Sequence, residues 1–195
     1  MRLIRPGGLA PVAWKNGGGV TREIARLDRG EATVWRLSLA DVDRDGPFSP
    51  FPGMERILTV VAGAGMVLET RAGPLQALPE TPLAFSGALE VVGRLSVGSV
   101  RNLNLIFDPV CFAANVSRLA GRAETDLDPA EGGTAGLYVL GGTVTATGGA
   151  PVPPGSVALC GDGPARVRLA PDARALWLDL APLHSDASSE AIAAR

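Results

Sequence analysis

The sequence predicts an all-β protein made of two small jelly-roll lobes, and three observations lead to this fold class. First, 25 glycines and 16 prolines are spread through the 195 residues, so few windows can hold a stable helix. Second, short runs rich in β-branched and aromatic residues recur, each bounded by Gly, Pro or Asp. Third, part of the first half is repeated in the second. Short strands at this spacing are typical of sandwiches and barrels.

The expected strands follow one another along most of the chain. In order they are residues 20–27, 33–42, 56–65, 90–98, 101–107, 134–142, 155–161, 165–171 and 175–182. Several of them alternate apolar and polar residues, which is the period of a half-buried strand. The helix candidate is residues 117–127, and it contains a central glycine.

A partial internal repeat indicates how the strands are organised. The stretch RILTVVAGAGMVLET resembles AGLYVLGGTVTATGG at an offset of 142 − 63 = 79 residues, which matches Leu58 with Leu137, Val60 with Val139 and Gly63 with Gly142. In both copies a strand breaks at a glycine and resumes, as a β-hairpin does. A chance match is the alternative, because Gly and Val are abundant. We expect a lobe at 1–110, a second at 111–183, both packed as one unit, and a flexible tail at 184–195.

Composition and charge exclude several classes of partner. The net charge is −2 with a pI of about 5.4, and no cluster of Lys or Arg compensates locally, so we expect no nucleic acid partner. No apolar run approaches the roughly 18 residues that cross a bilayer, and the N-terminus lacks the apolar segment of a secretory signal. We therefore expect a cytoplasmic protein without a membrane partner. Cys111 and Cys160 have no CxxC spacing and are expected to be reduced, buried thiols.

The scarcity of histidine limits the chemistry. The single histidine is His184, close to the C-terminus. A Ser-His-Asp relay, a Cys-His pair or a multi-histidine metal site cannot be built from one such residue. Carboxylate-only metal binding is the alternative, but the sequence has no dense cluster of Asp and Glu that favours it. The sequence therefore predicts a metal-independent protein with no cofactor.

The stretch WKNGGGVTRE is the most unusual local motif. Lys15 is the one lysine of the chain, and it precedes the pair Asn16-Gly17, which is a strong turn signal. The motif is not a phosphate-binding Walker loop, because the lysine comes before the glycines and a strand follows them. The extra glycines permit close approach to a neighbouring strand or to a ligand. A purely structural turn is the alternative.

Two of the expected strands carry matching polar stripes. Arg36 and Ser38 share one face of the strand at 33–42, and Asn102 and Asn104 share one face of the strand at 101–107. A solvated outer face and the lining of a ligand pocket both explain such stripes. The loop GPFSPFPG at 46–53 contributes two aromatic residues that either cover a pocket or plug the core.

The segments WKNGGGVTREIA, WRLSLADVDRDGPFSPFPGMERILTVVAGAGM, FSG and RNLNLIF, in this order, resemble the HutD/Ves family of cupin-like proteins. The resemblance covers most of the stretch from Trp14 to Phe107 and, more loosely, the second half. It implies a bicupin fold, that is, two double-stranded β-helix lobes, and an association with histidine utilisation without an assigned reaction. The histidines and glutamate that bind metal in other cupins have no counterpart here, since no histidine precedes position 184.

We expect one cavity to gather the cationic and polar groups of these motifs. Guanidinium groups suit carboxylates, so the expected ligand is a small anionic metabolite. The candidate ligand-binding residues are Lys15, Asn16, Arg22, Glu23, Arg36, Ser38, Arg56, Asn102 and Asn104.

Three functions are compatible with the sequence. The first is a metal-independent protein that senses or buffers a small carboxylate, for which the resemblance implies urocanate or N-formylglutamate. The second is a metal-independent isomerase or hydrolase acting on a similar acid, with Glu23 and Lys15 as candidate catalytic residues. The third is a protein-interaction module. A homodimer is compatible with each of them.

Overall fold

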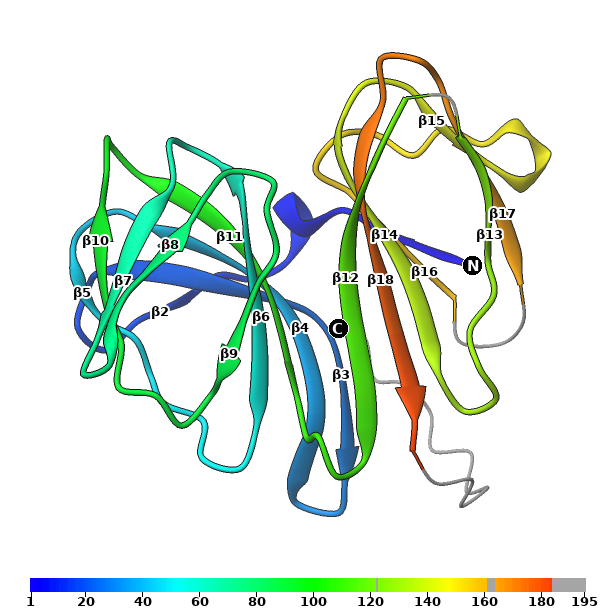
Figure 1. Cartoon of the computed structure of the whole chain (residues 1–195). Helices are drawn as coiled ribbons and strands as arrows, with labels where there is room; N and C mark the ends of the chain where they lie inside the picture. Colours follow the sequence, from blue (N-terminus) through cyan, green and yellow to red (C-terminus); the bar gives the residue numbers. More distant parts are fainter. Residues whose placement is uncertain (122, 161–163, 184–195) are drawn as a thin grey trace. The chain divides into compact units, whose positions relative to one another are not determined.

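The computed structural model describes residues 1–121, 123–160 and 164–183, and this part of the chain is built of β-strands with two short 3-10 turns, η1 (Pro6–Gly8) and η2 (Thr147–Gly149). The strands form two compact units (Figure 1). We call Leu9–Pro109 the first roll, and Met1–Gly8 together with the described residues between Val110 and Leu183 the second roll. The tail expected at 184–195, including His184, lies outside the described residues.

The first roll contains two antiparallel sheets. The larger sheet has the strand order β2 (Val12–Ala13), β3 (Gly19–Arg29), β4 (Ala32–Val42), β11 (Val100–Phe107), β6 (Glu55–Ala62) and β9 (Leu83–Ser86). The smaller sheet has the order β5 (Gly46–Pro47), β10 (Val92–Leu95), β7 (Met66–Thr70) and β8 (Gly73–Ala77). The hydrophobic core of this roll is a cluster that includes Leu58, Val60, Met66 and Leu68.

The second roll has the same two-sheet plan. Its larger sheet has the order β1 (Arg2–Ile4), β16 (Val157–Cys160), β14 (Thr134–Gly141), β18 (Arg174–Pro182) and β12 (Phe112–Ala120). Its smaller sheet has the order β13 (Ala123–Leu127), β17 (Ala165–Leu169) and β15 (Val144–Ala146). The first eight residues belong here rather than to the first lobe, because β1 pairs with β16.

The helix candidate at 117–127 is wrong. Within it, residues 117–120 lie in β12 and residues 123–127 form β13, and these strands pair with β18 and β17. Gly121, with φ of +78°, separates the two strands, and glycine adopts this backbone angle without strain. Cross-strand pairing therefore decides the structure of a segment whose local sequence is a poor helix former.

The internal repeat is visible in the strand order. The sequence β4-β11-β6-β9 in the first roll corresponds to β12-β18-β14-β16 in the second, and β5-β10-β7 corresponds to β13-β17-β15. Val60 lies on β6 beside a register shift, and Val139 lies on the equivalent strand β14 beside the same kind of shift. The two rolls therefore share an arrangement of seven strands, to which the first adds β2, β3 and β8 and the second adds β1. The fold is the predicted all-β bicupin.

The glycines that the repeat matches have the same physical role. Gly63 and Gly142 have φ of +98° and +76°. A Cβ atom on Gly63 would collide with the backbone carbonyl of Ser99, and one on Gly142 with that of Asp172. Both glycines thus combine a positive φ with a close backbone approach, which excludes larger residues at these positions.

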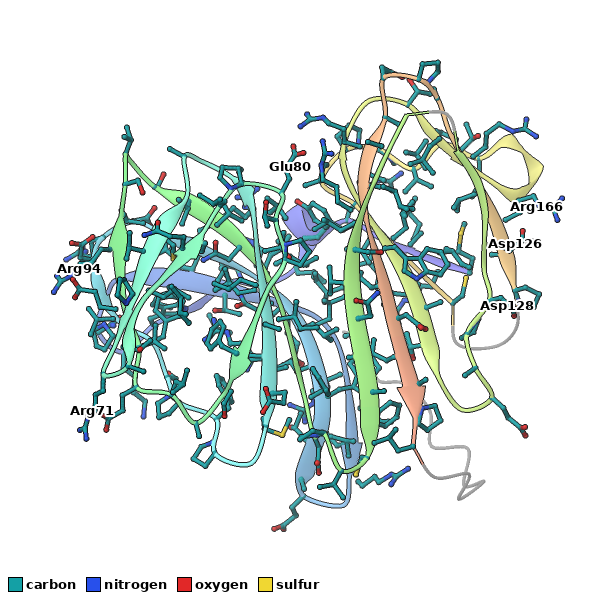
Figure 2. All side chains as sticks on the ribbon, viewed as in Figure 1. Arg71, Glu80, Arg94, Asp126, Asp128 and Arg166 are labelled. Atoms are coloured by element: carbon teal, nitrogen blue, oxygen red, sulfur yellow. The ribbon has the colours of Figure 1, made fainter. Side chains whose placement is uncertain are left out.

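Exposed charges on the smaller sheets are paired across strands. Arg94 on β10 donates from Nε to Glu69 on β7 at 2.8 Å. Arg166 on β17 donates from Nε to Asp126 on β13 at 2.8 Å, and Figure 2 shows these two labelled side chains together. Because both pairs are exposed to water, they contribute little to stability.

The two cysteines are free thiols. Cys160 is buried, and burial raises the pKa of its thiol, whereas Cys111 is half-buried.

In the described ranges, no helix has the length and apolar character that a bilayer-spanning segment requires.

Candidate functional site

The inner face of the larger sheet in the first roll carries an unusual group of polar side chains. The register places them on one face of four neighbouring strands: Glu23 on β3, Arg36 and Ser38 on β4, Asn104 on β11 and Arg56 on β6. Ser38 is directly opposite both Glu23 and Asn104, since residues paired across antiparallel strands share a face. Ile106 separates the two arginines in the next row.

These side chains line a cavity of about 620 Å³. This volume is in the range of small-molecule sites. The sheet forms one wall of the cavity, the β2–β3 turn with Trp14, Lys15 and Asn16 forms the second, and the loop with Phe48, Ser49 and Phe51 forms the third. The elements of the first roll alone therefore build a complete pocket.

Arg56 is the buried cation of this cavity, with 7% of its surface exposed. Its Nε and Nη2 both donate to Oδ1 of Asn104, at 3.0 and 2.6 Å. Its guanidinium carbon lies 5.0 Å from the ring centroid of Phe48 and 5.5 Å from that of Phe85. Among the described residues these two hydrogen bonds are its polar contacts, and no carboxylate pairs with it.

Burial and the nearby positive charge of Arg36 lower the pKa of Arg56 to about 9. The direction follows from physics, because both a low dielectric and a like charge disfavour the cation. Arg56 nevertheless keeps its proton at neutral pH. A buried positive charge without an anionic partner is energetically costly, and a ligand that supplies the anion would relieve this cost.

Arg36 is the second cation, and its pairing is incomplete. Its Nε lies 3.5 Å from Oε2 of Glu23, an ion-pair distance without hydrogen-bond geometry. This buried Nε has no hydrogen-bond partner within the described ranges. Glu23 is shared, because Arg26 also approaches its Oε1 at 3.9 Å. Both guanidinium groups of the cavity wall can therefore donate to an anion.

Asn16 links the glycine-rich turn to Pro47, which directly precedes the loop with Phe48. Oδ1 of Asn16 accepts a hydrogen bond from the backbone of Gly18 at 3.0 Å, and its Nδ2 donates to the carbonyl of Pro47 at 3.2 Å. Both the oxygen and the nitrogen of the Asn16 amide are thus hydrogen-bonded to the backbone. Gly17 has a φ of +67°, and a Cβ on Gly19 would collide with the carbonyl of Asp41. The glycines are explained by the turn and by its contact with β4.

Trp14 and Lys15 flank this turn. The indole of Trp14 donates from Nε1 to Oγ1 of Thr21 at 2.8 Å and packs edge-on against Phe48, with ring centroids 5.5 Å apart. Lys15 is exposed and lines the cavity at the same turn. The turn therefore supplies an aromatic wall and a solvated cation.

The prediction that Arg22 lines the cavity is wrong. This residue is opposite Leu39 in the register and lies on the other face of the sheet, where its Nη1 donates to Oδ2 of Asp41 at 2.6 Å. The reason is the period of two along a strand: if Glu23 faces the cavity, its neighbour Arg22 faces away. On Asp41, burial raises the pKa, but hydrogen bonds from Arg101 and Arg22 outweigh it and lower the pKa below 3.8.

Asn102 shares the inner face but does not line the cavity. It is fully buried, its Nδ2 lies 4.0 Å from Sδ of Met66, and its Oδ1 has no partner among the described residues. It sits one row deeper than Asn104, opposite Ala40 and Val60. The seven other predicted residues line the cavity: Lys15, Asn16, Glu23, Arg36, Ser38, Arg56 and Asn104.

The prediction omitted Val12 and Ala13 of β2, which line the cavity at the edge of the sheet. It also omitted three residues of the strands that carry the predicted side chains, namely Thr21, Ala40 and Ile106. Counting in steps of two from Glu23, Ser38 and Asn104 identifies each of them, so the signal was present in the strand period. Phe85 was also missed, because its approach to Arg56 depends on the pairing of β6 with β9.

A metal would need a cluster of suitable ligands. The described residues contain no group of three or more His, Cys, Asp and Glu side chains placed to hold a metal ion. Metal independence stays a prediction.

Comparisons with known proteins agree with the fold. The model of the HutD family matches residues 9–176. A 21.2 kDa protein from the hutC 3′ region of Pseudomonas putida is 41% identical over 137 residues, which are 65% of this chain and 72% of that protein.

Solved structures are similar over nearly the whole chain. HutD from Pseudomonas fluorescens SBW25, in a formate condition, is 30% identical with a TM-score of 0.82, covering 94% of this chain and 99% of that one. A conserved protein of unknown function from Pseudomonas aeruginosa PAO1 is 31% identical with a TM-score of 0.79, covering 92% and 98%. YlbA from Escherichia coli, at 12% identity and a TM-score of 0.71, covers 90% and 88% and shares the fold. The chain therefore belongs to the HutD family.

Proposed function

We propose that this protein binds a small carboxylate in the cavity of the first roll. The observation that carries the proposal is the state of Arg56, a buried cation whose Nε and Nη2 donate to a neutral amide and which has no carboxylate partner among the described residues. Arg36 adds a second guanidinium two strands away in the same row. An anion between the two would satisfy both, because guanidinium groups bind carboxylates through paired, charge-assisted hydrogen bonds.

The ligand we propose is an intermediate of histidine degradation, either urocanate or N-formylglutamate. The support is the family and the relative from the hutC 3′ region. The cavity adds a chemical argument that favours urocanate of the two: the rings of Trp14 and Phe48 form an apolar wall beside the cations, which suits a ligand with one carboxylate and a planar ring. Binding without turnover would make the protein a sensor or buffer of this acid.

The test is a thermal-shift screen of the full chain, followed by calorimetry. We expect urocanate or N-formylglutamate to raise the Tm in proportion to the logarithm of its concentration, and the corresponding neutral amide to leave it unchanged. Formate serves as the smallest carboxylate probe. The proposal fails if no carboxylate of this panel stabilises the protein at millimolar concentration.

A product assay on each stabilising acid separates binding from catalysis. NMR spectra that show the acid unchanged after prolonged incubation with the protein support the binding function. Conversion of the acid would instead favour the isomerase or hydrolase hypothesis, with Glu23 at 3.5 Å from Arg36 as the first residue to substitute.

A further inference from the structure

The immediate partner of Arg56 is chemically unexpected. A buried arginine is usually paired with a carboxylate, because the anion offsets the cost of removing the guanidinium charge from water. Here the pairing position is occupied by the neutral amide of Asn104, which is 3% exposed and accepts from both Nε and Nη2. An aspartate at this position would have nearly the same shape and would offer the same acceptor.

The amide of Asn104 is held in the orientation that this contact requires. Its Nδ2 donates to the backbone carbonyl of Asn102 at 3.4 Å, so its Oδ1 is directed toward Arg56. The side chain lies on β11, the strand directly paired with β6, which carries Arg56. Two neighbouring strands therefore fix the guanidinium, while the rings of Phe48 and Phe85 flank it.

An amide acceptor and a carboxylate acceptor differ in one respect that matters for binding. Both orient the guanidinium, but a carboxylate also cancels its charge. If a protein carboxylate already neutralised Arg56, a ligand carboxylate would gain little Coulomb energy from the guanidinium. It would also be repelled by the protein carboxylate a few ångströms away.

We infer that Asn104 is a positioning residue that fixes Arg56 while leaving its charge uncancelled, and that this uncancelled charge selects a carboxylate over its neutral amide. The inference rests on the proposed function and adds the residue that sets its specificity. It predicts opposite changes in affinity and stability for one substitution, Asn104→Asp. The new carboxylate would form an ion pair with Arg56 and so preserve the stability of the fold. It would also replace the ligand carboxylate as the anionic partner of Arg56 and so lower the affinity.

The test compares the wild-type chain with Asn104→Asp and Asn104→Ala, using urocanate and its neutral amide as probes in calorimetry and thermal unfolding. For Asn104→Asp we expect urocanate affinity to fall by about tenfold or more and the ratio of acid to amide affinity to fall toward one. We expect its Tm to stay at or above that of the wild type. For Asn104→Ala we expect both affinity and Tm to fall, because Arg56 then loses its acceptor.

The possible results separate the two proposals. Wild-type protein that binds no carboxylate of the screening panel removes the proposed function and this inference with it; if N-formylglutamate is the acid that binds, it and its amide replace urocanate as the probes. Wild-type protein that binds urocanate, with Asn104→Asp binding equally well or keeping the same acid-to-amide ratio, overturns the inference alone. An Asn104→Asp variant that loses affinity and Tm together, as Asn104→Ala does, assigns Asn104 a structural role and also overturns it.

Discussion

The two rolls share seven equivalent strands but differ in chemistry at equivalent positions of these strands. Their shared register shift aligns Val60 and its partner Asn102 with Val139 and its partner Ala175. Counting along the strands from these pairs makes Ala135 the counterpart of Arg56 and Trp177 the counterpart of Asn104. One roll thus has a buried cation and its acceptor where the other has a methyl group and an indole.

This difference shows which parts of the cavity the fold requires and which it does not. In the second roll Trp177 packs against a core cluster that includes Ala135, Leu137 and Val139. The same arrangement of strands therefore folds with apolar side chains at these positions. Burying apolar side chains there costs less free energy than burying a charged group. The arrangement of strands therefore does not by itself require the arginine and asparagine of the first roll, which is what the proposed ligand site predicts.

The indole is the first place to test the comparison. Trp177→Ala should lower the free energy of unfolding by about 3 kcal/mol, at the low end for such substitutions because the side chain is partly exposed. It should create no carboxylate site, since the counterpart of Arg56 there is Ala135. Denaturant unfolding and urocanate calorimetry check both parts, and a new binding site in this variant would contradict the comparison.

The reverse change transfers the contents of the second roll to the first. The double variant Arg56→Ala/Asn104→Trp should lose at least about a hundredfold in carboxylate affinity, roughly 2.7 kcal/mol, because cation and space disappear together. Its stability should equal or exceed that of the wild type, since an apolar pair replaces a buried charge. Retained binding with an intact fold, judged by circular dichroism and calorimetry, would show that the ligand site is elsewhere.

The second arginine of the cavity can be separated from those outside it. Arg36→Ala should weaken carboxylate binding by about tenfold to a hundredfold, the worth of one charge-assisted contact. Arg22→Ala is the matched control on the same sheet: its side chain faces away and pairs with Asp41, so affinity should be unchanged. Arg174→Ala in the second roll is a further control. Calorimetry that gives Arg22→Ala the larger loss would contradict the assigned faces.

The outer face of the same sheet predicts a pH effect on stability alone. The pKa of Asp41 is below its usual 3.8 in the folded chain, so its pairing with Arg101 and Arg22 stabilises the fold above this pH. The contribution is lost as the pH falls through the lowered pKa. Asp41→Asn should therefore cost about 1 kcal/mol at neutral pH and progressively less below pH 3.8. A gap in unfolding free energy between wild type and variant that is constant with pH would be the contrary result.

Much of this architecture can be predicted from the sequence, because it depends on periods and turns. The spacing of Gly63 and Gly142 identifies the duplicated hairpin, and the alternation around Ser38 and Asn104 identifies the polar face. The strand period also predicts the position of Arg22, because a residue adjacent to the cavity-facing Glu23 must lie on the opposite face of the sheet.

Other features depend on contacts between distant segments. The first eight residues join the second roll through the pairing of β1 with β16, which no local pattern signals. The sequence likewise gives no indication that the acceptor of Arg56 is Asn104, 48 positions away, because their contact exists only when β6 and β11 are paired.

The central claim is that the arginines of the first roll hold a ligand carboxylate, and a crystal structure tests it most directly. The protein would be crystallised with whichever acid gives the largest thermal stabilisation in the screen. We expect the carboxylate in the cavity, with its oxygens within hydrogen-bond distance of the guanidinium groups of Arg36 and Arg56, and Asn104 still bound to Arg56. An acid that lies outside this cavity, or that contacts neither arginine, would contradict the account.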